Sequence, residues 1–395
     1  MSITLTRRRF LTAAGALAAA ACAPSETPAP SASQLSEAEQ IQPVKLGYLP
    51  ITDASALLVA HANGYYADEG LSAEPTLFRG WSQIAEAFQA RQVNVVHLLM
   101  PMTVWMRYGL GFPLKVVAWA HMAGSALTVS QKIRTFNDLR GKTVAIPFYY
   151  SIHNVVLQIA VRKFGLDVAL PGANPSPEAV RLVVMAPPDM PTALSTGAID
   201  GYIVAEPFNA AGETLAGGRI LRFTADVWKD HACCVVVMHE EDVQARPAWT
   251  RKVLNAVVKA QKWTRENTAE AARLISKDGN GYLGSAAPVV TRAMTHYPIE
   301  EYGPTGAIKH PDWNQKRLAF QPYPYPSYTA ELVRRLKTTT VDGERAFLDK
   351  LDPEFVAQDL VNEKAVRAAY ESAGGPAAFG IDPAKAFTRE EIIDV

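Results

Sequence analysis

The sequence predicts a two-lobed α/β protein in which two parallel or mixed sheets, each with helices on both faces, flank a hinged cleft. Strand-like apolar runs alternate with helix-like segments from residue 44 onward. A second series of this kind begins near residue 130, and the buried strand CCVVVM (233–238) then leads back to the first. Alternating strands and helices build parallel sheets, and a chain that leaves one sheet and returns makes two crossings.

The first 42 residues read as an export signal and a tether. TRRRFL (6–11) matches the twin-arginine signature, and the apolar stretch that follows is too short to span a bilayer. We assign 1–21 to the signal peptide. The sequence before Cys22 resembles a lipobox, which predicts a lipid anchor on Cys22, although plain cleavage is the alternative. Residues 22–42 are rich in Pro, Ala and Ser, which predicts a flexible tether in the periplasm or at the outer face of the cytoplasmic membrane.

The first lobe is predicted to comprise 43–129 and 237–395, and the second lobe 130–236. In the first lobe we expect strands at 44–50, 73–79, 94–99 and 115–120, with helices at 54–66, 82–92 and 100–109. SALTVS (125–130) leads into the second lobe. There we expect strands ending near 147, 186, 205 and 224, with helices at 151–165, 190–198 and 206–218. Beyond Pro247 the chain reads as helical.

Candidate binding residues follow the ends of these strands, where open α/β sheets bind their ligands. They share aromatic, hydroxyl, imidazole, carboxyl or thiol chemistry: Asp53, Trp81, Ser125, Tyr149, Tyr150, Ser151, His153, Glu206 and Cys234. For several of them a structural role is the alternative. Trp81 and His153 can pack in a core, and only one of the two tyrosines is expected to face the cleft. Glu206 can cap its own helix, because acids are favoured near helix N-termini.

Two adjacent cysteines, Cys233 and Cys234, follow the motif WKDH (228–231). The eight histidines show no zinc-like spacing relative to them, so the sequence predicts no metal site. A disulfide between neighbouring residues would be strained, because adjacent Cα atoms are closer than disulfides prefer. We therefore expect the two thiols to line the cleft as small, polarizable groups.

The net charge argues against nucleic acid as a partner. Removing 1–21 removes three arginines and no acid, which leaves 36 basic against 39 acidic residues, a net charge of −3. No basic stripe accompanies this balance, whereas nucleic-acid binding depends on one.

Several ordered motifs resemble those of the periplasmic solute-binding proteins of nitrate, bicarbonate, sulfonate and taurine ABC importers. They include GYLPITDASALL from Gly47, the Gly80-Trp81 segment, PFYYSIHN (147–154), AEPFN (205–209) and WKDH. The likeness is closest to the nitrate/bicarbonate branch and covers the mature chain. It implies a type II-like periplasmic binding protein fold, no enzymatic activity and no cofactor.

The resemblance also implies site residues and partners. Trp81, Ser125 and His153 fall on the family's ligand-contacting positions. Ala232-Cys233-Cys234 stands where nitrate binders carry Pro-Glu-Lys, so the lysine of that segment is absent here. We expect a monomer that delivers a small oxyanion or organic acid to a permease and its ATPase in the inner membrane. The alternatives are a binder of a neutral or heterocyclic solute, a sensory binding lobe, or an enzyme similar to a pyrimidine-precursor synthase.

Overall fold

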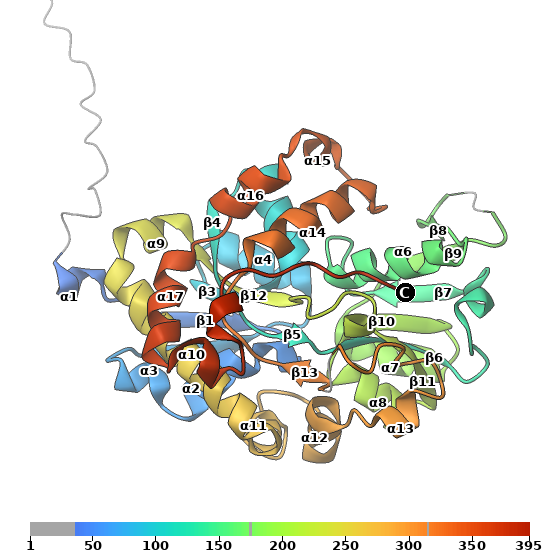
Figure 1. Cartoon of the computed structure of the whole chain (residues 1–395), viewed down its shortest axis with the longest axis horizontal. Helices are drawn as coiled ribbons and strands as arrows, with labels where there is room; N and C mark the ends of the chain where they lie inside the picture. The colour runs from blue at the N-terminus through green and yellow to red at the C-terminus, as the bar shows by residue number, and fades with distance from the viewer. Residues whose placement is uncertain (1–35, 174–175, 314–315) are drawn as a thin grey trace, which may run out of the picture.

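The computed structural model describes residues 36–173, 176–313 and 316–395. The signal peptide, Cys22 and most of the tether lie outside the described residues. The described chain forms two lobes side by side (Figure 1), which confirms the predicted fold class. None of its helices is both long enough and apolar enough to cross a bilayer.

The first lobe is built on a five-stranded mixed sheet. In spatial order its strands are β2 (Ala73–Leu77), β1 (Val44–Tyr48), β3 (Val95–Leu99), β12 (Cys234–His239) and β4 (Leu114–Trp119). Every residue of β12 is buried, as its valine run predicts for a central strand. Pro75 lies in β2, an edge strand, which is where a strand proline is tolerated.

The second lobe is built on a six-stranded sheet. Its order is β11 (Gly218–Phe223), β6 (Ser125–Ser130), β10 (Gly201–Ala205), β7 (Thr143–Ile146), β9 (Val180–Val184) and β8 (Val168–Ala169). Because β6 pairs with β10 and β11, the chain has crossed to the second sheet before Ser125, ahead of the predicted boundary at 130. It has returned by Cys234, ahead of the predicted 237. The alternation within a strand does not reveal which sheet the strand joins.

Helices cover both sheets (Figure 1). The first lobe carries the 3-10 turn η2 (Thr52–Ala54), α2 (Ser55–Ala62), α3 (Tyr65–Asp68), α4 (Trp81–Gln89) and α5 (Met100–Val104), which runs on as the π-helical turn η3 (Trp105–Gly109). The second lobe carries α6 (Ile152–Lys163), α7 (Met190–Ser195) and α8 (Phe208–Leu215). Ser151 caps α6 by accepting the Asn154 N–H at 3.1 Å, as a serine N-cap should.

The predicted helical region after Pro247 is confirmed, but it does not belong to the first lobe alone. Its main helices are α10 (Pro247–Glu266), α11 (Thr268–Ile275), α12 (Ala287–Thr295), α14 (Pro326–Thr338), α16 (Pro353–Asp359) and α17 (Glu363–Ser372), and α9 (Glu240–Ala245) directly precedes the region. Shorter helices are α13 (Ile299–Tyr302), α15 (Ala346–Lys350) and α18 (Gly375–Ala378). Tyr297, Tyr302 and Ile308 pack against Phe223 of the second lobe. The assignment of 237–395 to the first lobe is therefore too broad.

The two crossings lie next to each other. The first runs through β5 (Met122–Ala123), which pairs with β13 (Leu318–Ala319) and bridges to Ala232 of the second crossing. Ala123 N–H also donates to His231 O at 3.0 Å. Ala123 and Gly124 both have positive φ values, 59° and 73°, and so form the bend through which the chain changes lobe.

Candidate ligand-binding site

Three buried polar side chains meet at one edge of the first lobe's sheet. Asp53 follows β1, and Cys233 and Cys234 stand at the start of β12. Since β12 runs antiparallel to β3, and β1 is parallel to β3, the start of β12 lies at the edge where β1 ends. One carboxylate oxygen of Asp53 and the two Sγ atoms lie within 4.8 Å of one another, and both thiols are free.

The second lobe faces this cluster with Ser125 and His153. The imidazole Nε2 of His153 lies 2.9 Å from Ser125 Oγ and 3.7 Å from Cys233 Sγ. Ser125 Oγ is 3.9 Å from the same sulfur. His153 stands in the first turn of α6, so the helix that begins after Ser151 points it at the other lobe.

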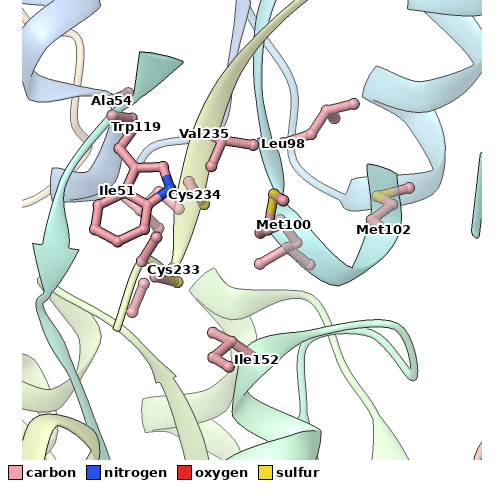
Figure 2. Packing of buried hydrophobic residues seen from close by; sticks show 14 of the residues in the cluster. Ile51, Ala54, Leu98, Met100, Met102, Trp119, Ile152, Cys233, Cys234 and Val235 are labelled. Atoms are coloured by element: carbon pink, nitrogen blue, oxygen red, sulfur yellow. The ribbon is translucent and has the colours of Figure 1, made fainter. Parts of the chain in front are cut away.

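Apolar side chains enclose the two thiols. Figure 2 shows Cys233 and Cys234 among residues of both lobes: Ile51, Trp119, Met100 and Ile152. Such surroundings penalise charged forms, because little water can solvate them. Burial raises the pKa of Asp53 to about 7 and that of Cys233 to about 12, and it raises the pKa of Cys234 as well.

The histidines around the cluster are neutral. Burial lowers the pKa of His153 to about 3 and that of His231 to about 4, and it also lowers the pKa of His121. His121 Nε2 lies 3.3 Å from Asp53 Oδ1 and 3.1 Å from Ala123 O. Because this imidazole is uncharged and directed at the carbonyl, the contact with Asp53 is not an ion pair.

Asp53 is consequently a buried carboxyl without a good partner. The side chain is completely buried, and neither of its oxygens has an aligned hydrogen bond to any residue that the structure describes. Within the described part of the chain, no lysine or arginine forms a hydrogen bond or ion pair with the three side chains of the cluster. The site therefore offers thiols, imidazoles, a hydroxyl and a carboxyl, but no cation.

Glu206 has structural partners. Its carboxylate accepts the Ala210 N–H at 3.0 Å and pairs with the buried Arg317 guanidinium at 2.5 Å. Burial raises the pKa of Glu206, which the charge of Arg317 opposes. The predicted capping role is thus present, whereas a free carboxylate for a ligand amine is not.

The structure places the other predicted site residues in other surroundings. Trp81 is buried against His97 of β3, with ring centroids 5.6 Å apart, and its indole N–H has no acceptor among the described residues. Ser151 uses its hydroxyl to cap α6. Tyr150 is buried and donates to Glu344 O at 2.8 Å, whereas Tyr149 is only partly buried.

Direct contacts already join the two lobes. Thr52 N–H of the first lobe donates to Glu206 O of the second at 2.8 Å. The ring of Trp105 stacks on that of Tyr150, with centroids 5.7 Å apart. At the surface, Arg79 pairs with Asp189 at 3.3 Å. The lobes are therefore in a closed arrangement.

Sequence reasoning missed His121 and Arg317. His121 follows β4 just as the other candidates follow their strands, so the same rule would have found it. Arg317 lies in the C-terminal helical region, and no local pattern marks a residue there as the partner of Glu206.

Known proteins resemble this chain in sequence. A model of the NMT1-like family matches residues 37–276. The nitrate/nitrite binding protein NrtA of a Nostoc species is 25% identical over 332 residues, which cover 73% of each chain. The nitrate import ATP-binding protein NrtC of Synechocystis is 29% identical over 230 residues, and the chain spans only 34% of its length.

Solved structures agree on the fold. The periplasmic nitrate-binding protein NrtA from Synechocystis superposes with a TM-score of 0.72 at 18% identity, covering 89% of this chain and 94% of that one. The periplasmic aliphatic sulphonate binding protein SsuA from Escherichia coli gives 0.54 at 16% identity, covering 83% and 97%. The two lobes thus form a periplasmic binding protein fold, and the chain belongs to the NMT1-like family.

Proposed function

We propose that the protein is the solute-binding component of an ABC importer and closes its two lobes over a small oxyanion or organic acid. The observation that carries the proposal is the meeting of Ser125 and His153 from one lobe with Asp53 and Cys233 from the other. A contact made by both lobes exists only in the closed state, so it provides the differential affinity that drives closure. The nitrate-binding and sulphonate-binding relatives support the transport role and the ligand class.

The charges at the site favour a second ligand class, a neutral or heterocyclic solute. The buried Arg317 is paired with Glu206 and Glu213. An ionised Asp53 would repel an anion. Among the described residues, no lysine or arginine pairs with Asp53 to offset that charge. The indole of Trp81 is an apolar surface suited to such a solute, and we keep the proposal that Trp81 and His153 form opposing walls of the cleft.

A solute-affinity screen tests the proposal. We would titrate the purified mature chain with nitrate, bicarbonate, alkanesulfonates, taurine and small heterocycles, with EDTA present, and follow intrinsic tryptophan fluorescence and thermal stability. Saturable binding of one compound with no chemical conversion supports the proposal; turnover of a bound compound contradicts it. Asp53→Asn separates the two ligand classes, since removing the carboxylate should strengthen binding of an anion and leave binding of a neutral solute little changed.

The partners follow from the same proposal. We expect a monomer that docks on a permease and its ATPase, as the names of the nitrate and bicarbonate import relatives suggest. Uptake by cells that carry this permease should stop when the binding protein is deleted. Coupling to a kinase instead of a permease would identify a sensory lobe.

The route to the periplasm and the lipid anchor are further proposals, since residues 1–35 are not described. Replacing Arg7 and Arg8 by Lys should impair export through the twin-arginine route. Cys22→Ser should release the protein from the membrane into the soluble periplasm. An unchanged membrane fraction in the Cys22 variant would contradict lipidation of that residue.

A further inference from the structure

The cluster of Asp53, Cys233 and Cys234 has the composition of a metal site rather than of a packed core. One oxygen and two sulfurs lie within 4.8 Å of one another, and all three side chains are completely buried. Thiols pack well among apolar groups, but a carboxyl does not. The sequence spacing did not indicate this cluster, because Asp53 joins the cysteines only through the order of strands β1, β3 and β12.

The lack of hydrogen bonds to the Asp53 carboxylate is a second observation, independent of how close the three side chains lie. A buried carboxyl that lacks hydrogen bonds is unfavourable relative to one in water, and neither oxygen of Asp53 has a hydrogen-bond partner among the described residues. Its neighbours in the cluster are thiols, which are weak donors and acceptors. A cation between the carboxylate and the two sulfurs would stabilise the buried carboxylate. The two sulfurs would serve as its further ligands.

We propose that Asp53, Cys233 and Cys234 bind one thiophilic d¹⁰ metal ion, Zn²⁺ or Cu⁺. Thiolate ligands select these ions, and zinc also accepts a carboxylate. Ligand atoms about 2.0–2.3 Å from a tetrahedral ion are separated by roughly 3.3–3.8 Å. The separations of at most 4.8 Å thus need to contract by about 1–1.5 Å at most, which small side-chain rotations provide.

The second lobe can contribute a further ligand. His153 Nε2 lies 3.7 Å from Cys233 Sγ, which is the separation expected of two ligands on one ion. It would exchange its contact with Ser125 Oγ for the metal. An ion at the cluster then contacts both lobes, and the closed arrangement holds it more tightly than the first lobe alone.

Binding involves no redox step. Each thiol that becomes a ligand loses its proton to solvent as its sulfur–metal bond forms, and a protonated Asp53 does the same. The ion keeps its oxidation state. The assignment concerns the cleft of the proposed transport function but stands whether or not a permease partner is found.

Metal stoichiometry and affinity test the site. We would reduce the mature chain with a phosphine, strip it with EDTA, and titrate it with Zn²⁺ against a chromophoric chelator, with an anaerobic arm for Cu⁺. The expected result is one equivalent bound with submicromolar affinity in at least one arm. Cys233→Ser and Cys234→Ser should each weaken binding at least a hundredfold, Asp53→Asn at least tenfold, and His153→Ala by a smaller factor than either cysteine change.

A control variant and a measurement on the wild type show whether a loss of binding is specific to the cluster. Asp226→Asn alters another buried aspartate, whose oxygens accept Lys309 N–H and His310 N–H, and should leave metal affinity unchanged. Co²⁺ substitution of the wild type should give a thiolate-to-cobalt charge-transfer band, which requires no variant to fold. Absence of stoichiometric binding by the reduced wild type overturns the proposal. Full retention of binding in the Cys233→Ser/Cys234→Ser double variant also overturns it. Solute binding measured with EDTA present separates this failure from failure of the transport proposal.

Discussion

Replacing Arg317 by Met should destabilise the protein by about 3–5 kcal/mol, the usual cost of removing one partner of a buried ion pair. Arg317 is buried and holds Glu206 at 2.5 Å, Glu213 at 3.3 Å and the carbonyl of His296 at 3.1 Å. Methionine fills much of the same volume without charge. The loss therefore comes mainly from Glu206, which stays completely buried and would have to remain charged without a partner or take up a proton.

The measurement is equilibrium unfolding in guanidinium chloride, followed by circular dichroism and tryptophan fluorescence. The double variant Arg317→Met/Glu206→Met should recover most of the loss, because an apolar replacement of a whole buried pair is often neutral. Arg79→Met serves as the matched control, because it breaks an exposed ion pair. The side chain of Arg79 is 70% exposed and that of its partner Asp189 is 59% exposed, so the change should alter stability little. If Arg317→Met costs no more than Arg79→Met, the argument from burial is wrong.

Three further predictions concern binding and pH. His153→Ala should weaken solute binding at least tenfold, or about 1.4 kcal/mol, by calorimetry, because its contacts cross the cleft; unchanged affinity would remove it from the site. Trp105→Ala should lower solute affinity up to about tenfold by removing the stack on Tyr150, worth about 0.5–1.5 kcal/mol, and small-angle scattering should show a more open molecule. Burial lowers the pKa of His97 to about 3, so the unfolded chain binds the proton first on acidification, and stability falls as pH drops below about 6.5. His97→Gln, which can still accept the Leu49 N–H, should lose about 2 kcal/mol less than the wild type between pH 7 and pH 5 in denaturant titrations; equal losses would contradict a neutral His97.

Local sequence patterns predicted the elements and the two-lobed class, since periodicity and capping residues act within a few positions. The helix expected from residue 151 and the buried strand β12 are examples. The rule that ligands bind at strand ends also selected Asp53, Ser125 and His153, which the structure brings close to Cys233 and Cys234. That these residues bind a ligand stays a prediction.

Long-range pairing could not be predicted in this way. The order of strands in the first sheet puts Asp53 beside Cys233 and Cys234, and nothing near Asp53 in the sequence encodes that order. Arg317, the partner of Glu206, belongs to the C-terminal region, parts of which pack against the second lobe. No local sequence pattern indicates that packing. For the same reason β6 was expected in the wrong place relative to the lobe boundary.

The adjacent crossings at Met122 and Ala232 define where a rotation axis between the lobes must pass. In a rigid rotation, displacement grows with distance from the axis. Cys233 directly follows one crossing and Ser125 follows the other, so these two residues should move less than distant positions as the lobes open. Surface positions such as Arg79 and Asp189 should separate much further. The distance between spectroscopic labels at Arg79 and Asp189 should therefore increase when the lobes open. The distance between labels beside the two crossings should change little.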